Sequence, residues 1–272
     1  MKERLDVLLV EKGFFSSRER AKASIMAGEV YVDGRLSDKA GTKIDPDADI
    51  EVRGDDCPYV SRGGYKLERA IEVFGLDLSG AVCVDIGAST GGFTDCMLQH
   101  GAKKVYAIDV GYGQLDWKLR SDPRVVSIER CNIRYFDPDT LEEPADFVSI
   151  DVSFISLRLV FPVAEKLLSE SGRLVCLVKP QFEAGKEQAD AGKGIIRDPS
   201  VHEQAIRDVI RYAEACGLSP FDLTYSPVTG AKGNIEFLLL VGKNDELRYN
   251  LKSIQEVVAS AHKALAEAPK NV

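Results

Sequence analysis

The sequence lacks any run of about 18 or more apolar residues, the length that a membrane-spanning helix requires. Its first residues, Met1-Lys2-Glu3-Arg4-Leu5-Asp6, are largely charged, whereas a secretory signal has an apolar segment near its start. Strongly basic amphipathic helices of the kind that bind membrane surfaces are also missing. We therefore expect a cytoplasmic protein that does not associate with membranes.

Cysteine and histidine are sparse, and neither forms the clusters that bind metals. No two of the six cysteines form a C-x-x-C pair, and the three histidines do not cluster with them. Most of the cysteines fall within apolar runs, where a free thiol behaves as a small hydrophobic side chain. The sequence thus predicts neither a disulfide nor a metal site.

An excess of basic residues is missing as well, since the chain has 35 Lys and Arg residues against 43 Asp and Glu residues. The net charge of −8 argues against a uniformly basic surface for nucleic acid but allows a local basic face. What the chain does have is length and apolar content. Its 272 residues, 44% of them hydrophobic, suffice for one α/β domain of roughly 200 residues plus a smaller domain.

The most informative pattern is residues 81–95, Ala-Val-Cys-Val-Asp-Ile-Gly-Ala-Ser-Thr-Gly-Gly-Phe-Thr-Asp. An apolar run, a glycine-rich turn and a potential helix follow one another, which indicates a buried parallel strand, a loop and a helix. Asp85 lies at the end of the strand, and the glycines permit positive φ angles and close approach of a ligand. The spacing D-x-G-x-x-x-G-G fits neither the dinucleotide-binding nor the P-loop fingerprint. The leading acid suits a cationic ligand better than a pyrophosphate, although the glycines could serve packing alone.

This stretch resembles the first motif of class I S-adenosylmethionine-dependent methyltransferases, whose cofactor carries an amino group and a sulfonium. Further strands are expected at residues 103–109, 125–128, 145–150, 172–178, 221–226 and 234–241. Asp109 ends the second strand, where a carboxylate can accept hydrogen bonds from ribose hydroxyls. Asn132 follows the third strand and has an amide for the adenine, although it could equally cap a turn. The cofactor residues implied are Asp85, Gly87, Ser89, Gly91, Gly92, Phe93, Asp109, Asn132 and Asp151.

The first 58 residues predict a small α+β unit of two helices followed by short strands. Arg4-Leu5-Asp6, Ser17-Arg18-Glu19-Arg20-Ala21 and the run from Gly28 to Gly34 resemble the RNA-binding module named after the S-four ribosomal protein. That module lays a positive face on structured RNA and contacts phosphates without reading bases. The positions that could do so here are Arg18, Arg20, Lys22, Arg35, Lys39 and Lys43. Alternatively, these are solvated charges, and acidic neighbours weaken their field.

A polar joint at residues 54–58, Gly-Asp-Asp-Cys-Pro, marks the expected boundary between a domain of residues 1–58 and one of residues 59–272. In the second domain, the segment 184–198 is rich in glycine and lysine, and a loop of such length usually indicates function or disorder. Further contacts with the RNA backbone are expected from Arg62, Lys186, Lys193 and Arg197.

Charged residues also stand at the ends of apolar strands. Asp151 directly follows a predicted strand, and Lys179 follows a nearly all-apolar one, where a charge is hard to explain structurally. Glu236 opens the last strand and reaches the same edge if that strand is antiparallel. Lys66, Asp151, Lys179 and Glu236 match, in order, the Lys-Asp-Lys-Glu tetrad of the FtsJ-like ribose 2′-O-methyltransferases.

With the S-four-like module in front, essentially the whole chain resembles the TlyA family, ribosomal RNA methyltransferases often labelled hemolysins. The resemblance implies an α/β class I (Rossmann-like) methyltransferase fold with a seven-stranded sheet and a small N-terminal α+β domain. It also implies S-adenosyl-L-methionine as cofactor, ribosomal RNA as partner and the ribose of a cytidine as methyl acceptor. One departure is the joint Cys57-Pro58-Tyr59-Val60, where actinobacterial members carry Arg-x-Trp-Val.

The tetrad suits this reaction chemically. A ribose hydroxyl is a poor nucleophile at neutral pH, so it needs a base or a cation that stabilises the developing alkoxide. If Lys66 and Lys179 lie close, each disfavours the charge of the other and the pKa of one falls, while Asp151 and Glu236 orient the amines. Which lysine loses its proton stays open. Two alternatives also stay open: a cytolysin, despite the missing signal and membrane span, and an RNA-binding scaffold with an inactive methyltransferase domain.

Overall fold

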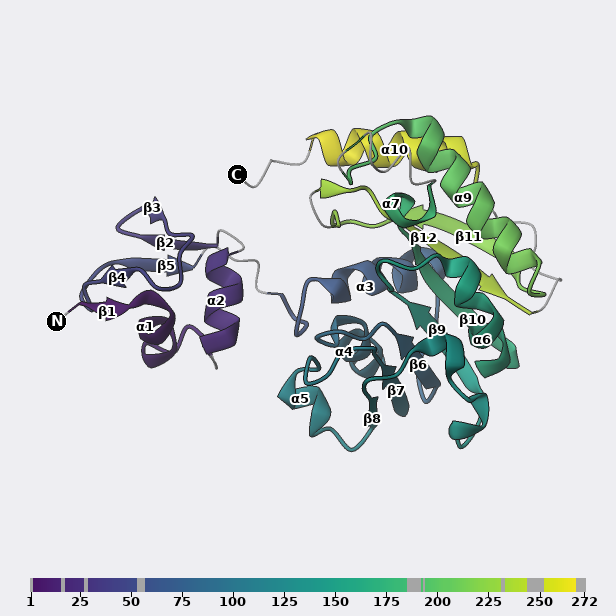
Figure 1. The fold of residues 1–272 in the computed structure, drawn as a ribbon, viewed down its shortest axis with the longest axis horizontal. Helices are drawn as coiled ribbons and strands as arrows, with labels where there is room; N and C mark the ends of the chain where they lie inside the picture. The colour runs from purple at the N-terminus through teal and green to yellow at the C-terminus, as the bar shows by residue number, and fades with distance from the viewer. Residues whose placement is uncertain are drawn as a thin grey trace. The chain divides into compact units, whose positions relative to one another are not determined.

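The computed structural model describes residues 2–15, 18–26, 29–52, 57–184, 192, 194–230, 233–243 and 252–267 (Figure 1). The described residues form two compact units, one that extends to Pro58 and one that begins at Tyr59. Two of the candidate RNA-binding residues, Lys186 and Lys193, lie outside the described residues, as does the side chain of Arg20.

The N-terminal unit packs two short helices against small antiparallel sheets. Its elements in chain order are β1 (Glu3–Arg4), α1 (Leu5–Glu11), α2 (Arg18–Met26), β2 (Val30–Val32), β3 (Arg35–Leu36), β4 (Lys43–Ile44) and β5 (Ile50–Val52). Strand β2 lies between β3 and β5, and β1 pairs with β4. The buried core consists of Leu5, Leu8, Leu9, Ala21, Ile25, Val30 and Ile44. This is the small α+β unit that the sequence predicts.

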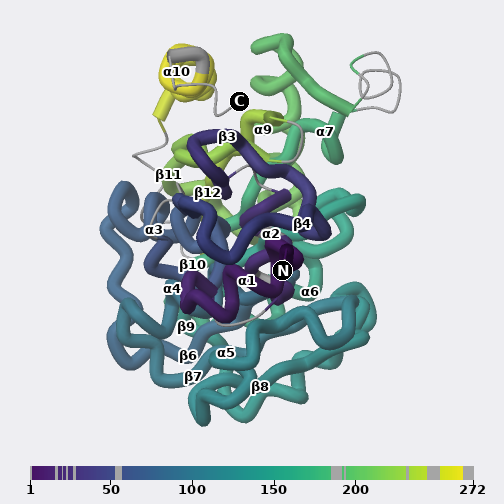
Figure 2. The backbone as a smooth tube through the Cα atoms, turned by 90° about the vertical axis from the view of Figure 1, so that its left-hand side faces the viewer, coloured from purple at the N-terminus to yellow at the C-terminus, as the bar shows by residue number. Residues whose placement is uncertain are grey.

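The larger unit is built on one seven-stranded sheet, which confirms the predicted fold class. Its strands are β6 (Val82–Ile86), β7 (Lys104–Ile108), β8 (Val125–Ile128), β9 (Ala145–Ile150), β10 (Leu168–Val178), β11 (Ser219–Tyr225) and β12 (Phe237–Gly242). Their order is β11-β12-β10-β9-β6-β7-β8, and Figure 2 shows it from β8 at the bottom to β11 near the top. Only β12 runs antiparallel to its neighbours β10 and β11. The parallel strands therefore end at one shared edge, where β12 begins.

Every residue of the central strand β6 is buried, which shows that both faces of this sheet are covered by helices. These helices are α3 (Gly63–Phe74), α4 (Gly92–Gln99), α5 (Trp117–Arg120), α6 (Phe161–Leu167), α7 (Pro180–Glu183), α9 (Pro199–Glu214) and α10 (Ile254–Glu267). Helix α3 packs on α4, and α9 packs on α10. Short 3-10 turns η1 (Ile133–Tyr135), η2 (Pro138–Thr140) and η3 (Leu157–Leu159) lie between the strands and helices.

Local sequence explains where the helices begin and end. Helix α9 begins at Pro199, whose fixed φ suits the first helical position, and the Asp198 carboxylate accepts the backbone N–H of Ser200 at 2.9 Å. Helix α3 ends before Gly75, which adopts a left-handed φ of 63°. Helix α10 packs against β11 as well as α9, so its apolar residues are covered within this unit.

Candidate active site

Four charged side chains from four elements meet at the carboxyl edge of the sheet. Lys66 lies in the first turn of α3, Asp151 directly follows β9, and Lys179 directly follows β10. Glu236 directly precedes β12, and the antiparallel course of that strand brings it to the same edge. The structure thus brings together all four residues that the tetrad pattern singled out.

The four side chains form a row of alternating charge. The Lys66 Nζ lies 2.7 Å from the Glu236 Oε2 and 3.6 Å from the Asp151 Oδ2. The other oxygen of Asp151, Oδ1, lies 2.5 Å from the Lys179 Nζ, which also donates a hydrogen bond of 3.0 Å to the Ser153 Oγ. Between 2% and 19% of each tetrad side chain is exposed, so water screens these charges poorly.

The contacts distinguish the two lysines. Burial lowers the pKa of Lys66, but the carboxylates of Asp151 and Glu236 outweigh it, so this pKa is raised. The sequence predicts that repulsion between the two lysines lowers the pKa of one of them. This does not apply to Lys66, because Asp151 forms ion pairs with both amines. Among the described residues, Lys179 pairs with one carboxylate, that of Asp151, whereas Lys66 pairs with two.

The glycine loop packs closely against its neighbours at each of the three glycines in the pattern D-x-G-x-x-x-G-G. Gly87 has a φ of +86°, and a Cβ atom there would lie 2.5 Å from the backbone oxygen of Asp151. A Cβ atom at Gly91 would collide with the Leu119 side chain, and one at Gly92 with the Ser61 hydroxyl. Packing therefore favours glycine at these positions whether or not a ligand binds, so a ligand role rests on other contacts.

Asp85 points into the protein interior and not toward the loop surface. Its carboxylate is fully buried and accepts hydrogen bonds from the Thr94 Oγ1 at 2.7 Å and the Ser149 Oγ at 2.9 Å. Burial raises its pKa to about 6, although the two hydroxyl hydrogen bonds act in the opposite direction. Asp85 thus joins β6 to α4 and β9. This geometry does not support the direct contact with a cationic ligand that the sequence predicts.

Asp109 lies beside the glycine loop, as the candidate for ribose binding should. Its Oδ2 accepts the backbone N–H of Ser89 at 2.8 Å, and its Oδ1 accepts that of Gly111 at 2.6 Å. Each carboxylate oxygen can accept a second hydrogen bond, which leaves capacity for a diol. Asn132 caps η1 by accepting the backbone N–H of Arg134 at 3.2 Å, so the capping alternative is realised there. Phe93 is buried within the unit, with 4% exposure.

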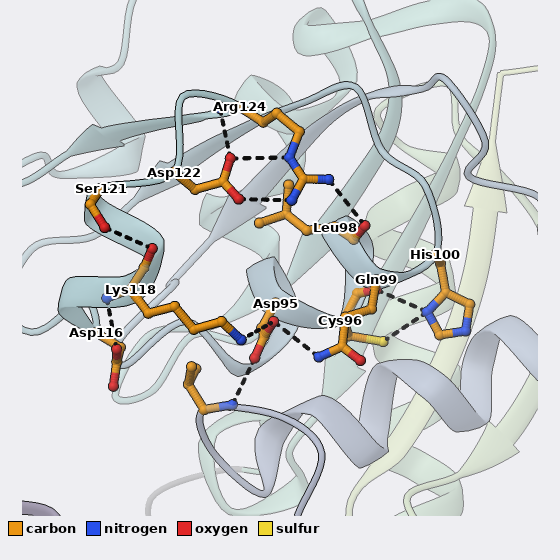
Figure 3. A network of polar contacts seen from close by, with 11 residues as sticks. Asp95, Cys96, Leu98, Gln99, His100, Asp116, Lys118, Ser121, Asp122 and Arg124 are labelled. Atoms are coloured by element: carbon orange, nitrogen blue, oxygen red, sulfur yellow. Dashed lines mark hydrogen bonds and ion pairs between the residues drawn. The ribbon is translucent and has the colours of Figure 1, made fainter. Parts of the chain in front are cut away.

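A buried acid on α4 fastens the beginning of the larger unit. Figure 3 shows Asp95 bonded to Gln99 at 3.1 Å and facing Lys118 at 3.7 Å. Its Oδ2 accepts the backbone N–H of Val60 at 2.9 Å, and the Tyr59 hydroxyl donates to a carboxylate oxygen of Glu68 on α3 at 2.7 Å. The segment Tyr59–Val60, which departs from the actinobacterial tetrapeptide, is therefore anchored to both α3 and α4.

The candidate RNA-binding residues are mostly exposed. Arg35, Lys39 and Lys43 in the N-terminal unit are exposed, Lys22 is partly exposed, and Arg62 and Arg197 in the larger unit are exposed. Arg18 is exposed too, and it donates a hydrogen bond of 2.9 Å to the buried Asp6.

Asp6 also holds Arg4, which sequence reasoning did not single out. The Arg4 Nε donates to the Asp6 Oδ1 at 2.9 Å, and the hydrogen bonds of Arg4 and Arg18 lower the pKa of Asp6 to about 2. In the sequence, Arg4 stands two residues before Asp6, an acid in the first turn of a helix, and this spacing could have revealed the pair. Asp6 thus fixes the guanidinium groups of two arginines on the surface of this unit.

An exposed aromatic residue stands three positions after Asp151 of the tetrad. Phe154 is 91% exposed, has a φ of +63° and lies with its ring 5.0 Å from the ring of Phe182 on α7. Ser153, its neighbour, holds the Lys179 amine.

Metal and membrane features are not found in the part of the chain that the structure describes. Its His, Cys, Asp and Glu residues form no group of three that could hold a metal ion. None of its helices is both long enough and apolar enough to cross a bilayer. The six cysteines are free thiols.

Comparison with known proteins identifies the class to which this architecture belongs. Residues 59–243 match the FtsJ-like methyltransferase family, and residues 3–50 match the S4 domain. The chain belongs to the FtsJ-like methyltransferase family, in the TlyA group that carries an S4 domain in front.

Its relatives cover nearly the whole chain. It is 40% identical to the "16S/23S rRNA (cytidine-2'-O)-methyltransferase TlyA" of Mycobacterium tuberculosis, over 98% of both chains. It is 50% identical to the "Putative rRNA methyltransferase YqxC" of Bacillus subtilis, over 100% of this chain and 98% of that one. A solved structure described as "Putative hemolysin from Streptococcus thermophilus" superposes with a TM-score of 0.78 at 49% identity, over 98% of both chains.

Proposed function

We propose that this protein is an S-adenosylmethionine-dependent methyltransferase that modifies the ribose 2′-hydroxyl of a cytidine in ribosomal RNA. The observation that carries the proposal is the row Glu236–Lys66–Asp151–Lys179, in which two carboxylates fix two amines at the ligand-binding edge of a methyltransferase sheet. The names of the TlyA relatives, which specify cytidine 2′-O-methylation, support the choice of acceptor.

The residues at the glycine loop fit S-adenosylmethionine. Asp109 has acceptor capacity for the two ribose hydroxyls next to the backbone of Ser89, and Asn132 lies on the neighbouring loop for the adenine. The backbone of Asp151 lies against Gly87, so its carboxylate would supply negative charge to a cationic cofactor held at this loop. When bound, this cofactor supplies an electrophilic methyl group.

Lys179 is the proposed general base of the site. A ribose hydroxyl must lose its proton as it attacks, and a positioned amine can accept that proton or stabilise the developing alkoxide. The Lys179 Nζ pairs with Asp151 and donates a hydrogen bond to Ser153. These two contacts fix where the amine can form a further hydrogen bond. Lys66 stays charged and holds Asp151 in place, and Glu236 in turn holds Lys66.

The N-terminal unit is the proposed RNA anchor. Asp6 holds Arg4 and Arg18 in fixed positions, which lowers the entropic cost of contacts with phosphates. The exposed Arg35, Lys39 and Lys43 add further positive charge. Near the tetrad, the exposed ring of Phe154 offers a face on which an unstacked base can lie, as single-stranded RNA recognition commonly requires.

Mapping of blocked 2′-hydroxyls tests the function directly. Ribosomal RNA from cells with and without the protein is compared, and RNA from cells that lack it is then incubated with purified protein and S-adenosylmethionine. We expect a cytidine whose 2′-hydroxyl is blocked only when the protein is present. A methyl group found on a base, or no methyl group on either subunit RNA, would refute the proposal.

A further inference from the structure

Glu183, the last residue of α7, is a partly buried acid outside the tetrad. Its Oε2 accepts a hydrogen bond of 2.7 Å from the Ser156 Oγ, and its Oε1 accepts one of 2.8 Å from the backbone N–H of Leu157. Burial raises the pKa of Glu183, although these hydrogen bonds act to lower it. Both carboxylate oxygens are thus committed to the loop that leads from β9 into η3.

Helix α7 holds this loop, residues 151–157, at both ends. At its start, Lys179 contacts Asp151 and Ser153. Four residues later, Glu183 holds the far end of the loop through two hydrogen bonds. Lys179 immediately precedes α7 and Glu183 ends it, so this four-residue helix joins the two attachments.

Phe154 lies between these two attachments, and its backbone has an unfavourable positive φ of 63°. A positive φ is unfavourable for a residue with a Cβ atom and costs about 1 kcal/mol or more. An exposure of 91% means that burial of the ring offsets little of this cost. Such a conformation persists only where the surroundings fix it, and the attachments by Lys179 and Glu183 do so.

We propose that Glu183 is a positioning residue for methyl transfer: it holds residues 151–157 so that Phe154 presents its ring to the acceptor nucleotide beside Lys179. The inference rests on the proposed RNA ribose methylation. It adds an acid that acts through the loop and not on the reacting atoms.

Two substitutions at Glu183 separate this role from a general loss of structure. Glu183→Ala removes both acceptors. Glu183→Gln keeps an oxygen for the Leu157 N–H, and its amide can donate to the Ser156 hydroxyl. Glu203→Ala on α9 is the matched control, because Glu203 pairs with the exposed Arg207 in an i,i+4 contact of little energetic weight. Melting temperatures and calorimetry of S-adenosylmethionine binding are recorded for all three variants. We expect cofactor affinity to match the wild type in all of them and the melting temperature of Glu183→Ala to fall by only a few degrees.

The first measurement is single-turnover methylation of ribosomal RNA at increasing RNA concentration. For Glu183→Ala, we expect the RNA concentration at half-maximal rate to rise by about tenfold, the scale of losing hydrogen bonds to a charged group. Glu183→Gln and Glu203→Ala should stay within about twofold of the wild type. An equal loss in Glu183→Ala and Glu183→Gln, or no loss in either, would overturn the proposal.

The second measurement asks whether Glu183 acts through Phe154. In a double-mutant cycle, Glu183→Ala should cost little further activity in a Phe154→Ala background, because the residue that it positions is already gone. Additive losses would contradict the proposal.

Hydrogen exchange of the Leu157 amide tests the attachment without any RNA. Protection should fall in Glu183→Ala and remain in Glu183→Gln, and unchanged protection in Glu183→Ala would contradict the attachment. A wild-type protein that methylates no ribosomal RNA would refute the proposed function itself, and with it the role of Phe154. Exchange at Leu157 would then still decide whether Glu183 holds the loop.

Discussion

Replacing Lys179 with alanine removes the tetrad lysine that has a single carboxylate partner. We expect Lys179→Ala to slow methyl transfer by a factor on the order of 100–10,000, the range for losing a positioned acid–base group. Binding of S-adenosylmethionine should persist, because Asp109 follows β7 and the glycine loop follows β6, whereas Lys179 follows β10.

The effect on stability should be small by comparison. The Lys179 Nζ lies 2.5 Å from the Asp151 Oδ1. At an effective dielectric constant of about 20, their attraction is roughly 7 kcal/mol. Withdrawing both ions from water costs several kcal/mol each, which offsets most of that attraction. Asp151 also keeps Lys66 at 3.6 Å in the variant. A net loss of about 0–2 kcal/mol would lower the melting temperature by only a few degrees in a domain of this size.

The assay measures single-turnover methylation of ribosomal RNA together with the melting temperature of each protein. Lys166→Ala, at an exposed lysine on α6, is the matched control and should keep its full rate. A catalytic Lys179 predicts a large loss of rate in a folded protein. A structural Lys179 predicts lost stability with normal rate per folded molecule. Near-normal turnover by folded Lys179→Ala would refute the assignment and the preference for ribose over a base as acceptor.

Three further predictions concern other parts of the chain. Replacing Arg18 and Lys22 with Gln should weaken ribosomal RNA binding and reduce the magnitude of its logarithmic salt slope by about one per lost phosphate contact, with cofactor affinity unchanged; an unaltered slope would contradict an anchoring role for α2. Gly87→Ala should lower the melting temperature as well as cofactor affinity, because its Cβ atom would lie 2.5 Å from a backbone oxygen; a normal melting temperature would show that the loop relaxes. Asp85 binds a proton more tightly when folded, with a pKa of about 6 against an ordinary 3.8, so the native state carries more protons in this window. Stability should therefore fall by about 3 kcal/mol as pH rises from about 4 to about 6, relative to Asp85→Asn, and equal pH slopes in denaturant unfolding would contradict this.

The sequence allowed the fold and the grouping of the site to be predicted because both follow from strand ends. Parallel strands place their carboxyl ends at one edge, so Asp109, Asp151 and Lys179, each directly after an apolar strand, could be assigned to a common edge. Chain order and spacing sufficed for this, since a strand of alternating or continuous apolar residues has little freedom in where it ends. The match of Lys66 and Glu236 to the tetrad then came from the family resemblance.

The direction of individual side chains could not be predicted in this way. Asp85 ends up between two hydroxyls in the interior, a choice set by Thr94 and Ser149 on two other elements. The left-handed backbone of Phe154 depends on attachments that sequence spacing does not reveal. In each case the deciding partner is remote in sequence, and a pattern read along the chain carries no information on remote partners.

The reversal of a single strand shows how much of the site depends on topology. Strand β12 has six residues, Phe237–Gly242, and at ~3.3 Å per residue it spans roughly 20 Å. Had β12 run parallel to β10, Glu236 would begin at the opposite edge of the sheet, about that far from Lys66. Asp151, which Lys179 shares, would then be the one carboxylate left beside Lys66. Burial, which lowers the pKa of Lys66 and favours the neutral amine, would meet less opposition. The antiparallel course of β12 therefore does more than complete a tetrad: it supplies the second carboxylate that keeps Lys66 charged, next to an Asp151 that also pairs with Lys179.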